Sequence, residues 1–176
     1  MPAYIGLLKG VNVGGKNKVN MGELRNLFEE MGYTDVKTYI NSGNILFDSD
    51  ASERDLIPAI EKEIERRFGV SIPIVLRTVE EWTASIEASP YANQAADNGK
   101  RVNIGYMVEE PSQAFIQKVE ESKGEDECTF IGRDLHILLN QSAADSKLLR
   151  NQSKLGTITV RNWNTIQKLA QLSINN

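Results

Sequence analysis

The chain has 176 residues with ordinary globular composition, since 40 % of the residues are hydrophobic and 25 % are charged. The formal net charge of −4 argues against a protein that coats nucleic acid without sequence preference, because such binding needs a basic surface. With one histidine, His136, and one cysteine, Cys128, the chain can form neither an internal disulfide nor a Cys/His zinc cluster.

The sequence also lacks the patterns of export and membrane insertion. The first residues do not combine a basic region with an apolar run, as a secretory signal would. No stretch approaches the roughly 20 apolar residues that span a bilayer. We therefore expect a protein of the cytoplasm that makes no membrane contact, and we expect no cofactor and no metal.

The first elements in chain order are a strand, a loop and a helix. Residues 4–9 are a short apolar run that predicts a strand, and residues 10–19 form a long loop with three glycines. Asn20, followed three residues later by Glu23, resembles a capping box and predicts the start of a helix. Gly32 suits the left-handed position at the end of that helix.

A hairpin and a second helix follow. Strands are predicted at 36–40 and 45–47, and Asn41-Ser42-Gly43-Asn44 between them is a typical turn sequence. Ser52 opens a helix that Gly69 closes. Pro58 suits the first turn of a helix, so the pattern indicates a start later than Ser52.

A strand at 72–77 completes a β-α-β-β-α-β order in the first 78 residues, which is the ferredoxin-like order. Thr78 and Glu81 form another capping box and open a helix. Residues 88–100 are small and polar, and they are the candidate boundary or mobile loop.

The second half repeats a β-α-β-β-α pattern with little sequence identity. The expected fold class is therefore α+β with two ferredoxin-like subdomains, at 1–78 and 101–176, joined by a helix and linker at 79–100. One mixed sheet with helices on one face is the alternative. The predicted elements of this half are strands at 102–108, 128–131 and 135–139, a helix from Pro111 to about Ser122, and helical segments near 145–151 and 160–172.

The glycine-rich loop satisfies most of a nucleotide-binding P-loop pattern. Residues 10–17 match G-x-x-x-x-G-K, but Asn17 replaces the Ser or Thr that would ligate Mg²⁺. The segment 45–48 resembles the apolar strand ending in Asp that supports such a metal. Two features disfavour a kinase-like P-loop: the helix cap at Asn20 comes too late, and the segment 36–47 reads as a hairpin.

A weaker inference about the same loop does not need a P-loop. Glycines allow consecutive backbone amides to line a concavity, and Lys9, Lys16 and Lys18 surround it with positive charge. This composition suits a phosphate, a carboxylate or a nucleotide. The alternative is that the glycines only shape a flexible connection.

Polar residues near the C-terminus extend the candidate set. Thr159 is the predicted cap of the last helix, and Trp163 belongs to its buried stripe. Arg161 would then lie in the first helical turn, where acids are preferred, which favours an anionic partner for it. A solvated helix face is the alternative. His136 and Cys128 are expected to be structural.

Three segments together resemble the bacterial domain-of-unknown-function family 1697. They are 7–15 (LLKGVNVGG), 38–44 (TYINSGN) and 161–165 (RNWNT). The resemblance extends over nearly the whole chain and implies a paired, duplicated ferredoxin-like arrangement, but it carries no established activity. Lys9 stands where the resemblance implies Arg in many relatives, so the charge is kept and the bidentate geometry is lost.

The favoured function is binding of a small anionic ligand, either a nucleotide or a phosphorylated metabolite, at the loop from Gly10 to Lys18. A nucleic-acid-binding module and a protein–protein adaptor are alternatives, and no nucleophile or base identifies an enzyme. If the last helix packs against the first half, the three segments converge on one pocket. The candidate ligand-binding residues are Lys9, Gly10, Asn12, Gly14, Gly15, Lys16, Lys18, Asn41, Ser42, Asn44, Arg161 and Asn162.

Overall fold

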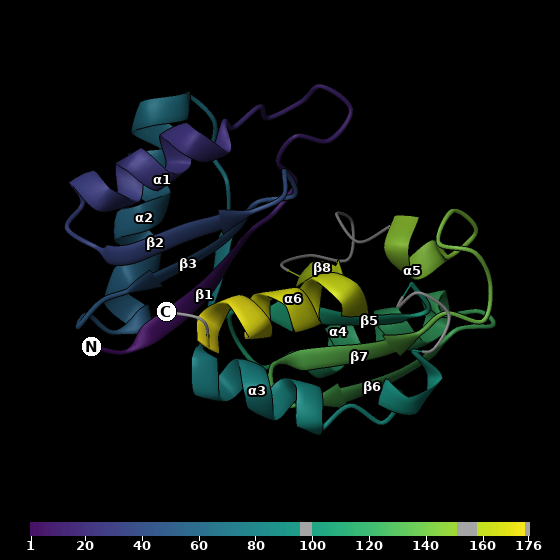
Figure 1. Ribbon diagram of the computed structural model, residues 1–176. Helices are drawn as coiled ribbons and strands as arrows, with labels where there is room; N and C mark the ends of the chain where they lie inside the picture. Colours follow the sequence, from purple (N-terminus) through teal and green to yellow (C-terminus); the bar gives the residue numbers. More distant parts are fainter. Residues whose placement is uncertain (96–99, 151–157, 175–176) are drawn as a thin grey trace. The chain divides into compact units, whose positions relative to one another are not determined.

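The computed structural model describes residues 1–95, 100–150 and 158–174 (Figure 1). The chain divides into two compact units. The first unit comprises Met1–Thr83 together with the C-terminal residues from Leu169, and the second comprises Ala84–Lys168. None of the helices in the described part of the chain is long and apolar enough to cross a membrane.

The first unit contains a four-stranded antiparallel sheet in the order β2-β3-β1-β4, together with two helices (Figure 1). The β-α-β-β-α-β order predicted from the sequence is confirmed. Its elements are β1 (Ala3–Leu8), α1 (Met21–Glu30), β2 (Thr34–Tyr39), β3 (Asn44–Asp48), α2 (Glu53–Phe68), β4 (Ile74–Thr78) and the start of α3 (Val79–Glu87).

Both faces of the central strand β1 are buried. Tyr4 and Leu8 of β1 belong to one core cluster with Phe28 of α1 and Ile60 of α2. Because side chains alternate along a strand, Ile5 and Leu7 face the other side, and both are buried as well. This burial explains why β1 is a continuous apolar run rather than an alternating one.

Local capping signals place the helices of the first unit. Asn20 accepts a hydrogen bond from the backbone N–H of Glu23, at 2.9 Å. The capping box that begins α3 is also present: Thr78 Oγ1 accepts from the Glu81 N–H at 3.1 Å, and Glu81 Oε1 accepts from the Thr78 N–H at 2.9 Å. Each of these bonds satisfies an N–H that would otherwise lack a partner at the helix start.

The predicted late start of α2 is wrong. The helix begins at Glu53, directly after its cap Ser52, and Pro58 lies inside it. The buried stripe of Leu56, Ile60 and Ile64 extends across the proline. Packing of this stripe therefore holds the helix together through a position that lacks one backbone hydrogen bond.

The second unit has the same sheet topology, in the order β6-β7-β5-β8. The fold class, α+β with two similar subdomains, is thereby confirmed. Its elements are the end of α3, the short 3₁₀ helix η1 (Ala92–Gln94), β5 (Val102–Met107), α4 (Gln113–Ser122), β6 (Glu127–Ile131), β7 (Asp134–Leu138), α5 (Lys147–Arg150), β8 (Ile158–Asn162) and the first half of α6 (Trp163–Ile174).

The predicted helix from about 160 begins later than the sequence suggested. Residues 158–162 form β8, which pairs antiparallel with β5, and the β-branched run of Ile158, Thr159 and Val160 suits a strand. Thr159 is therefore not the helix cap. Asn162 takes that place, because its Oδ1 accepts a hydrogen bond from the Thr165 N–H at 3.0 Å.

Three smaller differences concern the boundaries of the second half. Helix α4 was predicted to begin at Pro111 but begins at Gln113, because the side chain of Ser112 caps it. The predicted linker at 88–100 contains η1, and residues 96–99 lie outside the described residues. Residue 151, the end of the predicted segment near 145–151, also lies outside them.

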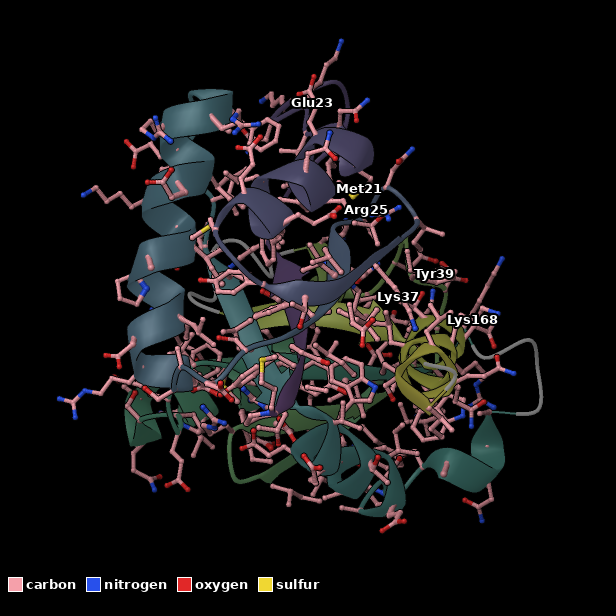
Figure 2. All side chains as sticks on the ribbon, turned by 60° about the vertical axis from the view of Figure 1, so that its left-hand side comes forward. Met21, Glu23, Arg25, Lys37, Tyr39 and Lys168 are labelled. Carbon is pink, nitrogen blue, oxygen red and sulfur yellow. The ribbon has the colours of Figure 1, made fainter. Side chains whose placement is uncertain are left out.

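The end of α6 belongs to the first unit. The backbone oxygen of Leu172 accepts a hydrogen bond from Lys37 Nζ at 3.3 Å. Figure 2 shows Lys37 and Tyr39 together on β2. A lysine at the carboxyl end of a helix is electrostatically favourable, so this contact helps to keep the end of α6 beside the edge strand.

The duplication is visible at single residues. Ile5-Gly6 in β1 corresponds to Ile104-Gly105 in β5, and Arg77 and Arg161 lie opposite the two isoleucines in register. Each arginine also donates from Nη1 to the carbonyl of the preceding residue, at 3.0 Å in both units. The two halves therefore provide an internal comparison of which features a unit needs in order to fold.

Candidate functional site

The loop after β1 and the turn after β2 lie at the same end of the first sheet. Leu7 of β1 is opposite Asn44 of β3 in the antiparallel register. The Leu8 N–H donates to the Gly43 carbonyl at 2.8 Å. The chain therefore leaves β1 directly beside the turn at 40–43.

Asn12 joins this loop to this turn. Its Nδ2 donates to the Asn41 carbonyl at 2.7 Å and to the Val19 carbonyl at 3.0 Å, and its Oδ1 accepts from the Val19 N–H at 2.9 Å. An amide has two N–H donors, so both are in use. The side chain of Asn12 thus positions the start of the loop, the end of the loop and the turn.

The loop itself has a defined shape. The Lys16 N–H donates to the Val13 carbonyl at 2.9 Å, and the Asn12 N–H donates to the Asn17 carbonyl at 3.1 Å. Between these bonds Gly14 and Gly15 have φ angles of 57° and 77°, which glycine adopts with little cost. The two glycines therefore allow a closed tip at 13–16.

The turn is held by its own side chains. Asn44 is fully buried, and its Nδ2 donates to the Tyr39 carbonyl and to Ser42 Oγ, both at 2.9 Å. Gly43 has φ 88°, and a Cβ there would lie 2.6 Å from Cγ2 of Val11. These contacts give Asn44 and Ser42 a role in shaping the turn.

A pocket of about 400 Å³ lies where the loop, the turn and the start of α1 meet. Lys18 contributes a cationic side chain, and the first turn of α1 adds the partial positive charge of a helix N-terminus. Figure 2 shows Met21 and Arg25 on one side of α1. The pocket is lined by Asn12, Gly15, Lys18, Val19, Asn20, Met21 and Asn41.

Four predicted site residues line this pocket: Asn12, Gly15, Lys18 and Asn41. Others lie in the same loop or turn without lining it: Gly10, Gly14, Lys16, Ser42 and Asn44. Lys9 lies at the base of the loop, where burial lowers the pKa of its ammonium group. Val19, Asn20 and Met21 also line the pocket but were not among the predicted site residues, although the cap at Asn20 signalled that α1 begins directly after the loop.

The third predicted segment lies in the second unit. Arg161 is on β8, and burial lowers the pKa of its guanidinium group to about 10. Asn162 caps α6, and Trp163 begins that helix in a buried position. Convergence of this segment with the loop and the turn stays a prediction.

The loop and the turn also lie within a match to a known protein family. The model of one family matches residues 1–136 and therefore includes both the loop and the turn. The chain belongs to this family, described as Protein of unknown function (DUF1697). A search of curated proteins gave no match.

A solved structure resembles this DUF1697 chain over nearly its whole length. It is the conserved bacterial protein SP0830 from Streptococcus pneumoniae, which is 27 % identical. The alignment covers 97 % of this chain and 98 % of that chain, with a TM-score of 0.78. The two proteins therefore share the paired α+β architecture.

The geometry of the DUF1697 site does not fit a P-loop. Asp48, the predicted metal-supporting residue, is opposite Ala3, whereas the loop leaves the other end of β1. A P-loop needs parallel strands whose carboxyl ends share one edge, and the sheet is antiparallel throughout. The Asp48 carboxylate therefore lies at the far end of the sheet from the loop.

The single cysteine and the single histidine both lie in sheltered positions. Cys128 is half-buried, and burial raises the pKa of its thiol to about 11, so it is protonated near neutral pH. His136 is fully buried. The expectation that both residues are structural agrees with these positions.

Candidate site segments of the first unit are longer than their counterparts in the second. Residues 9–20 connect β1 to α1, whereas only 108–112 connect β5 to α4. Residues 40–43 connect β2 to β3, whereas only 132–133 connect β6 to β7. The shorter connections of the second unit are still joined to each other, since Arg133 Nη1 donates to the Val108 carbonyl at 2.8 Å. A unit of this topology therefore folds without the longer loop and turn.

Proposed function

We propose that this DUF1697 protein binds a small anionic ligand, a nucleotide or a phosphorylated metabolite, in the pocket formed by the 10–18 loop, the turn at Asn41 and the start of α1. The observation that carries the proposal is the internal comparison. The longer loop and turn occur in one unit only, and there Asn12 joins them beside a pocket. We further propose a ferredoxin-like topology for each unit and a cytoplasmic location.

The charge of the pocket supports an anion. Lys18 lines it, and Lys16 is exposed on the same loop. Backbone N–H groups at the start of α1 add partial positive charge, as in other anion sites at helix N-termini. A volume of about 400 Å³ lies within the range of roughly 300–1,000 Å³ that small-molecule sites occupy.

The structure gives less support to a nucleic-acid module. Ferredoxin-like modules of that kind stack bases on aromatic side chains exposed on the sheet. In the first unit the sheet residues on the side away from α1 and α2 include Ile5, Leu7 and Leu46, which are buried and aliphatic. These buried aliphatic residues offer no such platform, which leaves Tyr39 of β2, in register with Asn44 and Leu7, as the aromatic residue on that side.

The test is binding of inorganic phosphate and adenosine monophosphate to the full chain, measured by thermal shift and by calorimetry. Ligand at 100 times its Kd stabilises the folded state by about 2.7 kcal/mol, which is a readily measured shift. Lys18→Gln should weaken binding about fivefold or more, because it removes the charge that lines the pocket.

Lys62→Gln is the matched control, since Lys62 is an exposed lysine on α2. It removes the same charge from the same unit away from the pocket, and it should leave the Kd unchanged. The proposal fails if neither anion binds, or if the two lysine variants lose the same affinity.

A further inference from the structure

Two aliphatic side chains stand exposed beside the pocket. Val13 is 64 % exposed and Ile40 is 49 % exposed. Each is the chain neighbour of a pocket-lining residue, Asn12 and Asn41, and these two neighbours are hydrogen bonded to each other at 2.7 Å. Consecutive Cα atoms are about 3.8 Å apart, so the Cα atoms of both aliphatic residues lie about that far from the Cα of a lining residue, although Val13 and Ile40 are not themselves among the lining residues.

An isoleucine is an unusual residue at position 40, because the backbone there is left-handed. Ile40 has φ 49°, and the other non-glycine residues with positive φ in the described chain are Asn12, Asn17 and Asp35. Asn and Asp tolerate this left-handed region, whereas a β-branched side chain there is strained by about 1–2 kcal/mol. An Asn or Gly at position 40 would avoid that strain.

Neither burial nor topology explains the isoleucine. Its side chain is half exposed, so the core gains little from it. In the second unit the corresponding connection needs only Gly132 and Arg133. Strained residues that the fold does not require are concentrated at binding sites.

We propose that Ile40, together with Val13, contacts the apolar part of an organic anion whose charged group occupies the pocket. The ligand class is then an organic phosphate or carboxylate that carries an aromatic or aliphatic group, rather than a bare inorganic anion. This inference rests on the proposed function, because it assigns the rim of the same pocket. Ile40 acts as a specificity-determining residue.

The experiment compares inorganic phosphate with phenyl phosphate, two anions that differ by one apolar group. The full chain should bind phenyl phosphate about tenfold more tightly, as expected for burial of a modest apolar surface. Ile40→Gly should abolish this tenfold preference and leave the Kd for inorganic phosphate within about twofold of the original value. Ile40→Leu should retain the preference, because it keeps an aliphatic side chain.

Asp35→Gly is the matched control. Asp35 has φ 50° and lies at the opposite end of β2, so this variant also places a glycine at a left-handed position, but away from the pocket. It should leave both affinities unchanged. Thermal unfolding of each variant, followed by circular dichroism, shows whether the fold is intact.

The outcomes separate the two proposals. If neither inorganic phosphate nor phenyl phosphate binds the original chain, this inference fails, and the proposed function fails as well when adenosine monophosphate does not bind. If the original chain binds both anions equally, or if Ile40→Gly weakens both to the same extent, only this inference fails. A loss confined to phenyl phosphate, absent in Asp35→Gly and restored by Ile40→Leu, supports it.

Discussion

Single residues decide the backbone path around the candidate site. Gly43 has φ 88° and lies close to Val11 and Leu8. A Cβ added to Gly43 would lie 2.9 Å from the Cβ of Leu8. Gly32, at the end of α1, has a similar φ of 94° but open space around the same position. Substitutions at Gly43 and Gly32 therefore separate the free-energy cost of a left-handed backbone from the free-energy cost of a steric clash.

Gly43→Ala should destabilise the fold by about 2–4 kcal/mol, from backbone strain plus overpacking. Gly32→Ala should cost only about 1–2 kcal/mol, from strain alone. Urea unfolding at neutral pH measures both free energies. Equal losses would show that the turn relaxes away from Val11 and Leu8, and the close packing of loop against turn would then be wrong.

At the scale of elements, local sequence signals predicted several of the helix caps. The caps at Asn20, Ser52 and Thr78 use side chains that bond to an N–H three residues away, so a short window of sequence contains them. The start of α6 was predicted wrongly, because Thr159 and Asn162 are both suitable caps. Pairing of β8 with β5 decided between them.

Asn162→Ala should destabilise the second unit by about 1 kcal/mol, because the Thr165 N–H loses its acceptor. Asn162→Asp should retain the original stability, since a carboxylate keeps the acceptor and suits a helix N-terminus. Thermal unfolding of the two variants checks this. A loss in Asn162→Asp as large as in Asn162→Ala would contradict a capping role.

For the whole molecule, the duplication makes each unit a reference for the other. Ile5 is opposite Leu46 in the first sheet, and the equivalent Ile104 is opposite His136 in the second. His136 is fully buried, and neither ring nitrogen has a hydrogen-bond partner among the described residues. Burial lowers the pKa of His136, although Asp134 opposes this shift.

This position predicts acid sensitivity. The folded state binds the imidazole proton less readily than the unfolded state, whose pKa is about 6.5. Stability should therefore fall as the pH drops below about 6.5, and it should stop falling below the folded pKa. His136→Leu should remove this loss and stabilise the fold by about 1–3 kcal/mol at neutral pH, because it removes an unpaired buried polar group. Urea unfolding between pH 5 and 8 measures both effects, and an unchanged acid slope in the variant would exclude His136 as its source.

Part of the candidate site was accessible from the sequence. Glycines and lysines in the 10–18 loop marked this segment as the candidate site, and four of the predicted residues line the pocket. The sequence did not indicate that Asn12 and Asn44 act on the protein itself. Their hydrogen-bond partners are backbone groups of the loop and the turn, and residue type alone does not distinguish such a partner from a ligand.

The sequence by itself determined the local structure: helix caps, turn residues, apolar strands and the repeated order of elements. These depend on bonds and steric limits within a few consecutive residues. The tertiary structure alone decided that residues 158–162 form a strand, that Asn12 reaches Asn41 across 29 positions, and that α1 begins at the pocket. Each of these depends on contacts between segments far apart along the chain, which are settled only when the sheet and its core assemble.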